Sequence, residues 1–209
     1  MIVQTEKIQK PKQLVMASAS PRRAELIQTF GIPATIMPSH CDESVPTDWS
    51  ADKVVEQLAL RKARAVVEQA KASIDEPYNG IFIVGADTVV VSDGEILGKP
   101  LDEADAAQML KRLQNHVHTV MTGVAIVSLE TGEAVVSHGE TIVSFKAFSD
   151  ALIERYIRSG EPMDKAGAYG IQGLLSTHID RIEGCYFNVV GFPLSVFSDL
   201  LASFGLEAW

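Results

Sequence analysis

The chain has 209 residues, of which 46% are hydrophobic and 22% charged. This is the composition of a globular protein with a sizeable core, and it excludes a disordered or collagen-like chain. Its 18 basic and 27 acidic residues give a net charge of −9 with neutral histidines. Because duplex nucleic acid and anionic lipid require clustered positive charge, this balance argues against a broad binding surface for either, although it allows a small basic pocket.

Cysteines and apolar runs bear on the cellular compartment. Cys41 and Cys185 belong neither to a CxxC pair nor to a Cys/His cluster, so they indicate no zinc site and fit a reducing compartment. No run approaches the ~18 apolar residues that span a bilayer, and the polar opening lacks the apolar stretch of a signal peptide. We therefore expect a cytoplasmic protein with no membrane partner. Residues 1–13 would form a polar N-terminal extension and residues 14–209 a single domain.

The first predicted elements are a strand, a loop and a helix. Residues 14–17 form a short apolar run, and helical spacing of apolar residues begins after Pro21. Ser20 is the expected N-cap, proline is tolerated at the first helical position, and Gly31 closes the far end. The loop is therefore expected to direct backbone amides of the helix start outward.

A longer helix is expected from Asp52 to about Ala72, and its apolar stripe contains Lys62. Because lysine stems commonly lie over hydrophobic surface with the ammonium in water, position alone favours that interpretation of Lys62. Residues 81–91 then form a β-branched run typical of a strand buried on both faces, interrupted at residues 85–88.

The rest of the chain alternates further strands and helices. We expect a turn with a short return strand at 92–100, a helix capped by Asp102, two long strands joined by a hairpin at Thr131 and Gly132, a helix capped by Ser149 and Asp150, a loop-rich segment at 160–173, a strand-like region at 179–193 and a last helix at 194–204. The hairpin excludes a purely parallel sheet. We predict an α/β fold with a mixed, twisted sheet, helices on both faces, and a smaller lobe from the middle of the chain over a cleft.

The motif SASPRR places Ser18, Ser20, Arg22 and Arg23 at a strand-to-helix junction. Backbone amides at a helix start and bidentate guanidinium groups together suit a phosphate or carboxylate group. An ordinary capped helix with solvated arginines is the alternative.

Asp87 interrupts an otherwise apolar strand. A carboxylate at the end of a buried strand has a high desolvation cost unless a metal, a cation or a set of donors offsets it. Ligands of open α/β sheets bind just beyond such strand ends. The alternative is an aspartate that merely caps a turn.

Lys99 lies in GEILGKP, which fails as a Walker phosphate loop because three residues, not four, separate its glycines and Pro100 stands where Ser or Thr would hold magnesium. His116 and His118 have no third ligand nearby, so surface or packing roles are favoured over metal binding. In the segment DKAGAYGIQG, Gln172 could read a base edge or a carbonyl group; a flexible connector is the alternative.

These motifs occur together in the order SASPRR, RKARA, GADTVV, GKP, VHTVMTGVAI, GEPMDKAGAYGIQG and FNVVGFP. As a set they resemble the Maf family of nucleoside triphosphate pyrophosphatases, and the resemblance runs from about Leu14 to Leu201. It implies a Maf/ITPase-like α/β fold with two lobes around a cleft. It also implies cleavage of a nucleoside triphosphate to the monophosphate and pyrophosphate with a divalent cation, Mg²⁺ or Mn²⁺.

The resemblance also implies roles for individual residues. Asp87 matches the catalytic acidic residue, and Arg22, Thr88 and Gln172 match the positions that set base specificity in the branch acting on dTTP and UTP, with modified pyrimidine triphosphates as further candidates. The implied phosphate-binding set is Ser18, Ser20, Arg23, Lys62, Lys99 and Lys165. The metal would be held by Asp87 with Glu43.

Family members are often dimers, so a homodimer is a further expectation, although no apolar stripe in the sequence indicates an interface. The alternative function is that of a regulatory nucleotide- or nucleic-acid-binding protein linked to septum formation. The net charge of −9 weighs against direct DNA contact. A nucleotide kinase would require the phosphate loop that is missing here.

Overall fold

A seven-stranded mixed sheet organises this computed structural model, which describes residues 9–75 and 77–208. The strands are β1 (Gln13–Met16), β2 (Ala34–Ile36), β3 (Ile81–Ser92), β4 (Glu95–Leu97), β5 (Val117–Ser128), β6 (Ala134–Phe145) and β7 (Ile179–Gly184). Their order is β2-β1-β3-β5-β6-β7, with β4 paired to β3. Strand β1 runs parallel to β2 and β3, and the other pairs are antiparallel. The predicted mixed sheet is confirmed.

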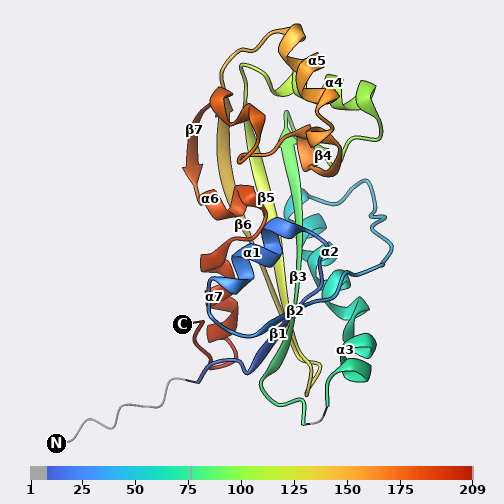
Figure 1. The fold of residues 1–209 in the computed structure, drawn as a ribbon, viewed down its shortest axis with the longest axis vertical. Helices are drawn as coiled ribbons and strands as arrows, with labels where there is room; N and C mark the ends of the chain where they lie inside the picture. The colour runs from blue at the N-terminus through green and yellow to red at the C-terminus, as the bar shows by residue number, and fades with distance from the viewer. Residues whose placement is uncertain (1–8, 76, 209) are drawn as a thin grey trace, which may run out of the picture.

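Helices cover both faces of this sheet, as predicted (Figure 1). They are α1 (Pro21–Gln28), α2 (Ala51–Ala65), α3 (Val67–Ser73), α4 (Glu103–Leu113), α5 (Asp150–Arg158), α6 (Tyr186–Val190) and α7 (Leu194–Ala202), with 3-10 turns η1 (Glu161–Asp164), η2 (Ala166–Ala168) and η3 (Leu174–His178). Alternate residues of β3 serve the two faces, because successive side chains of a strand point to opposite sides. Phe82 and Val84 pack beneath α1 and α7, whereas Ile83 packs beneath α2, and these two layers form the core at this end of the sheet.

A second core lies toward the other end of the long strands. It joins α4, α5 and the η1 to η3 segment to the distal parts of β3, β5 and β6. Figure 1 shows these three strands running the length of the molecule, with α4, α5 and β4 gathered at one end. This end is the smaller lobe expected from the middle of the chain. None of the helices among the described residues is long and apolar enough to cross a bilayer.

Three helix starts are those expected from their capping residues. The side chain of Ser20 accepts a hydrogen bond from the Arg23 amide at the start of α1. Asp102 accepts likewise from the Asp105 amide in α4, and Ser149 caps α5. Each cap satisfies an amide that has no partner within its helix.

The predicted elements differ from the structure in four places. The helix expected over residues 52–72 divides at Val66, whose side chain is buried in the core and whose amide bonds the carbonyls of Ala63 and Arg64. The strand continues through residues 85–88, because every residue from Phe82 to Val91 pairs with β5, so Asp87 lies within β3 and not at its end.

The other two differences lie in short elements. The strand-like region at 179–193 is a strand only as far as Gly184, where φ is +125° and helix α6 follows. The three-residue strand β2 has too short an apolar pattern to be read from sequence. Of the expected N-terminal extension, residues 1–8 lie outside the described part, and Gln13 already belongs to β1.

Candidate functional site

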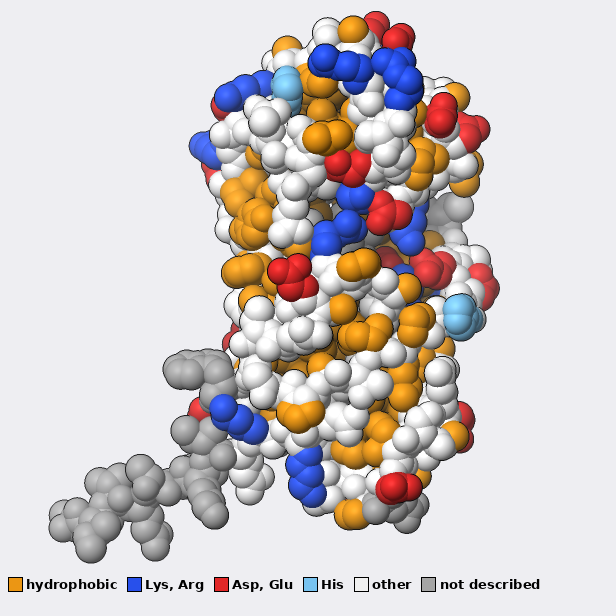
Figure 2. Space-filling view, in the orientation of Figure 1, with side chains coloured by type: hydrophobic (Ala, Val, Ile, Leu, Met, Phe, Trp, Pro, Cys, Tyr) orange, Lys and Arg blue, Asp and Glu red, His pale blue; other side chains and the backbone are white. Residues whose placement is uncertain are grey.

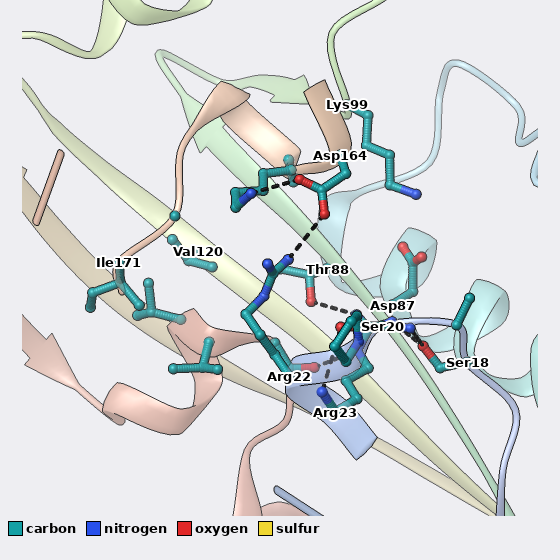
Figure 3. A pocket seen from close by; sticks show the side chains of 18 of the residues that line it. Ser18, Ser20, Arg22, Arg23, Asp87, Thr88, Lys99, Val120, Asp164 and Ile171 are labelled. Atoms are coloured by element: carbon teal, nitrogen blue, oxygen red, sulfur yellow. Dashed lines mark hydrogen bonds and ion pairs between the residues drawn. The ribbon is translucent and has the colours of Figure 1, made fainter. Parts of the chain in front are cut away.

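A cavity of about 750 Å³ lies beyond the end of β1, between the two cores. All eleven residues singled out from the sequence line it: Ser18, Ser20, Arg22, Arg23, Glu43, Lys62, Asp87, Thr88, Lys99, Lys165 and Gln172. Figure 2 shows Lys, Arg, Asp and Glu side chains gathered midway along the molecule, and Figure 3 shows the cavity from close by. The fold therefore brings together every predicted site residue.

The cavity follows an open stretch of one edge of β3. Strand β1 pairs only with residues 81–84 of β3, and β4 pairs only with residues 90–92. Among the described residues, no strand covers residues 85–89 on this side. Side chains from both faces of the sheet therefore reach the cavity, and the consecutive residues Asp87 and Thr88 enter it from opposite faces.

Lys62 and Asp87 form an ion pair at the centre of this site. The Lys62 ammonium lies 2.6 Å from Asp87 Oδ1 and 3.1 Å from Glu43 Oε1. The side chains of Lys62 and Asp87 are only 9% and 10% exposed. The interpretation of Lys62 as a lysine with its ammonium in water is therefore wrong, because the ammonium faces inward onto two carboxylates. This contact also offsets the desolvation cost of Asp87, which excludes a mere turn cap.

Glycines of two strands set the distance between Lys62 and Asp87. A Cβ atom at Gly85 would lie 2.0 Å from the Ala59 carbonyl oxygen, and one at Gly123 would lie 2.3 Å from the Val55 carbonyl oxygen. Helix α2 thus rests directly on the backbone of β3 and β5. Lys62 lies on the α2 face that meets the sheet, and Asp87 is on the strand face that carries Gly85, so their side chains meet.

The SASPRR segment is more ordered than a capped helix with solvated arginines. The Arg23 guanidinium donates from Nε to the Gly191 carbonyl oxygen at 2.7 Å, from Nη1 to Ser18 Oγ at 3.3 Å, and from Nη2 to Thr88 Oγ1 at 2.9 Å. Burial lowers the pKa of Arg23, and the charge of Asp87 opposes that effect. Arg23 therefore ties the loop after β1 to β3 and to the end of α6.

The glycine-rich segment forms the wall that faces SASPRR. Lys165 Nζ donates to the Glu161 carbonyl oxygen and to Asp164 Oδ1, both at 2.6 Å, and Asp164 lies 3.9 Å from the Arg22 guanidinium. Lys99 and Gln172 are exposed at the cavity. The segment is not a flexible connector, because its middle residues are buried in the second core.

The two histidines singled out from the sequence lie in a packing and in a surface position. His118 is buried, and its Nε2 lies 2.7 Å from the Tyr169 hydroxyl, so it packs the glycine-rich segment against β5. Burial lowers the pKa of His118 to about 4. His116 is exposed.

Two supporting residues were missed by the sequence analysis. Thr122 and Asn188 are fully buried, and the Thr122 hydroxyl lies 2.9 Å from that of Thr88 and 2.8 Å from the Asn188 carbonyl oxygen. The available signal was a threonine inside the apolar run VMTGVAI. A polar side chain in such a run requires a buried partner.

The carboxylates suit the expected divalent metal. Among the described residues, no group of three or more His, Cys, Asp or Glu side chains could hold a metal alone. Asp87 and Glu43 nevertheless hold one cation, the Lys62 ammonium, between them. Magnesium is typically held by one or two carboxylates together with substrate phosphates and water, so this donor set fits Mg²⁺ or Mn²⁺ that arrives with a nucleotide.

Comparison with known proteins identifies the family of this chain. The family model described as Maf-like protein matches residues 13–204. Curated proteins named dTTP/UTP pyrophosphatase are similar over nearly the whole chain. The one from Moorella thermoacetica is 48% identical over 94% of this chain and 97% of its own, and that from Desulforamulus reducens is 44% identical over 94% and 98%.

Solved structures give a more distant likeness. The Ham1 protein of Staphylococcus aureus is 14% identical over 80% of each chain, with a TM-score of 0.38, which is too low to support an argument about this fold. The family assignment therefore depends on the match over residues 13–204 and on the close relatives. By these criteria the chain belongs to the Maf family.

Proposed function

We propose that this protein hydrolyses dTTP and UTP between the α and β phosphates, releasing the nucleoside monophosphate and pyrophosphate. The observation that carries the proposal is the buried Lys62–Asp87 pair in a cavity lined by four further basic residues. The relatives named dTTP/UTP pyrophosphatase support the same activity. Modified pyrimidine triphosphates are further candidate substrates.

The charges of the cavity suit a triphosphate. A nucleoside triphosphate carries about four negative charges, and attack by water increases the charge on the phosphoryl oxygens in the transition state. The five cations are Arg22, Arg23, Lys62, Lys99 and Lys165, and they come from four segments of the chain. Fixed cations around the reacting phosphates stabilise that charge without reorganisation during the reaction.

Asp87 is the proposed proton acceptor. Lys62 donates to Asp87 Oδ1 and so fixes the orientation of the carboxylate. The second oxygen, Oδ2, is then free to take a proton from a water molecule that attacks the α phosphorus. A divalent metal held by Asp87 and Glu43 would neutralise phosphate charge and lower the pKa of bound water.

The two faces of β3 separate the two tasks of the site. Asp87 lies on the face of α2, where Lys62 and Glu43 gather. Thr88 lies on the opposite face, and Val120, Ile171 and Gln172 line the same cavity. We infer that attack on the α phosphorus takes place on the α2 side and base recognition on the other, with Arg23, which bonds Thr88, between the two. Arg22, Thr88 and Gln172 are the proposed specificity residues.

Release of pyrophosphate from a panel of canonical and modified triphosphates, with titration of Mg²⁺ and Mn²⁺, tests the proposal. We expect the highest kcat/KM for UTP and dTTP, and we expect Asp87→Asn to remove most turnover in a folded protein. Near-normal turnover in Asp87→Asn would refute the assigned role. Binding without turnover for every nucleotide would instead favour the regulatory alternative.

A cytoplasmic location and a homodimer stay predictions. Nucleoside triphosphates are abundant in the cytoplasm, which suits the proposed substrate. Sedimentation of the purified full-length chain would decide the oligomeric state.

A further inference from the structure

A chain of hydrogen bonds leads from Arg23 of the SASPRR segment through β3 and β5 to the backbone of α6. Arg23 Nη2 donates to Thr88 Oγ1 at 2.9 Å, and Thr88 Oγ1 lies 2.9 Å from Thr122 Oγ1. Thr122 Oγ1 in turn lies 2.8 Å from the carbonyl oxygen of Asn188. Thr88 lines the cavity, whereas Thr122 is fully buried and does not.

The chemistry of the two end groups determines the direction of every bond in this chain. A backbone carbonyl can only accept, so the single hydroxyl proton of Thr122 goes to Asn188. Thr122 then has no proton for Thr88, and the Thr88 proton must go to Thr122. At the other end, a guanidinium can only donate, so Arg23 uses one of the two lone pairs of Thr88. Thr88 therefore offers the cavity one lone pair and no proton.

The anchor of this chain is rigid. Asn188 is fully buried, and its Nδ2 donates to the Val120 carbonyl oxygen at 2.9 Å and to Thr141 Oγ1 at 3.0 Å. A Cβ atom at Gly139 would lie 2.8 Å from Asn188 Oδ1, so the side chain fills the space above β6. The Asn188 carbonyl thus stays in place as the acceptor for Thr122.

We propose that Thr122 is a positioning residue for base selection: by accepting the Thr88 proton, it restricts Thr88 to accepting a hydrogen bond from the nucleotide base. Uracil and thymine carry an N–H donor at position 3, whereas cytosine carries a lone pair there. Uracil satisfies the Thr88 oxygen, and cytosine places one lone pair against another. A site that requires a donor rejects an analogue lacking it, because the buried acceptor is left unpaired.

This inference rests on the proposed function in one respect, because it takes a pyrimidine nucleotide as the ligand of this cavity. Its test therefore measures binding of the product nucleotides UMP and CMP by calorimetry, which requires no turnover. We expect the unaltered protein to bind UMP at least about tenfold more tightly than CMP, which corresponds to about 1.4 kcal/mol, the size of one hydrogen bond.

The decisive variant is Thr122→Val, which removes the hydroxyl but keeps the shape of the side chain. Its Thr88 proton is free to turn toward the ligand, so we expect the ratio of the CMP to UMP Kd values to fall toward one, chiefly through tighter CMP binding. Thr122→Ser retains the hydroxyl and should keep the ratio of the unaltered protein. A purely structural role for Thr122 would weaken both nucleotides equally and leave the ratio unchanged.

A double-mutant cycle tests whether Thr122 acts through Thr88. Thr88→Val should lose the preference for UMP, and adding Thr122→Val should change the ratio no further, because residues acting through one contact are not additive. A further loss in the double variant would overturn the proposal. Thr122→Val removes one of the two donors to the Asn188 carbonyl oxygen, which keeps its bond from the Gly191 amide at 3.0 Å. Thr122→Ala, which leaves room for a water molecule in place of the hydroxyl, serves as a second variant with the same expected ratio.

The remaining outcomes also decide between explanations. Equal binding of UMP and CMP by the unaltered protein would overturn the proposal whatever the variants do. UMP that lacks the 3′-hydroxyl tests whether the sugar, and not the base, donates to Thr88. If binding depended on Thr122 only when the 3′-hydroxyl is present, the donor would be the sugar and the proposal would be wrong. A Thr122-dependent preference for UMP without any pyrophosphate release would sustain the inference and refute the proposed hydrolysis.

Discussion

The contact between α2 and the sheet makes Gly85→Ala a sensitive test of how the site is built. The added Cβ would lie 2.0 Å from the Ala59 carbonyl oxygen and 2.8 Å from the Ala63 amide nitrogen. A carbon to oxygen contact is normally about 3.3 Å or more, so α2 must move by roughly 1 Å. Both atoms belong to the helix backbone, so no side chain can give way in its place.

The consequences for stability and for turnover follow from that shift. Overpacking of this kind costs about 1–3 kcal/mol, which for a chain of this size lowers Tm by roughly 2–12 °C. Lys62 moves with α2, and its 2.6 Å contact with Asp87 lengthens. A displacement of about 1 Å in a catalytic arrangement can cost about 100-fold in rate.

The assay compares Gly85→Ala with Gly98→Ala by thermal unfolding and by pyrophosphate release from UTP. Gly98 is a matched control, because a Cβ there meets nothing within 4 Å. We expect Gly98→Ala to behave as the unaltered protein and Gly85→Ala to lose both stability and kcat. If Gly85→Ala kept its Tm and kcat, the argument that this glycine sets the Lys62 to Asp87 distance would be refuted.

Three further predictions concern single side chains. Gln172→Ala should lower the ratio of kcat/KM for UTP over GTP, and an unchanged ratio would remove Gln172 from base recognition. Burial lowers the pKa of His118 from about 6.5 to about 4, so between these pH values the unfolded chain binds a proton that the folded chain does not. The free energy of unfolding should therefore fall by up to about 3 kcal/mol as the pH is lowered from 6.5 to 4. Chemical denaturation of His118→Gln over the same pH range should show a shallower fall. Ser149→Ala should cost about 1 kcal/mol in the same denaturation assay, because the Leu152 amide loses its cap, and should leave kcat for UTP unchanged.

Much of the site could be predicted because its motifs combine local physics with a family pattern. The Ser20 cap, the basic SASPRR loop and a lone aspartate in an apolar strand each indicate a particular environment. Their convergence on one cavity follows from the parallel pairing of β1 with β3, which places Ser18 near Asp87. The order of the residues along the chain does not by itself predict that β1 pairs with β3.

The errors came where tertiary contacts override local pattern. The interpretation of Lys62 with its ammonium in water failed because its apolar stripe faces the sheet, where the ammonium contacts Asp87 of β3 and Glu43 of the loop before α2. The division of the long helix at Val66 depends on how that side chain is buried. Thr122 and Asn188 could not be recognised as a pair, because 66 residues separate them and the β5 to α6 contact is formed only in the fold.

The site also changes the meaning of the overall charge. Five of the 18 basic and four of the 27 acidic residues line one cavity, a balance of +1, which leaves 13 basic against 23 acidic residues, a balance of −10, for the rest of the chain. A cavity that gathers five cations and four carboxylates inside an acidic exterior suits a small triphosphate that brings its own metal ion better than it suits a nucleic acid polymer.

Hydrolysis of UTP in water labelled with oxygen-18 tests the central claim most directly. If a water molecule that gives its proton to Asp87 attacks the α phosphorus, the label enters UMP and the released pyrophosphate stays unlabelled. Asp87→Asn should then lose the labelled product. Label in pyrophosphate, or orthophosphate as the first product, would show attack at another phosphorus and contradict the account.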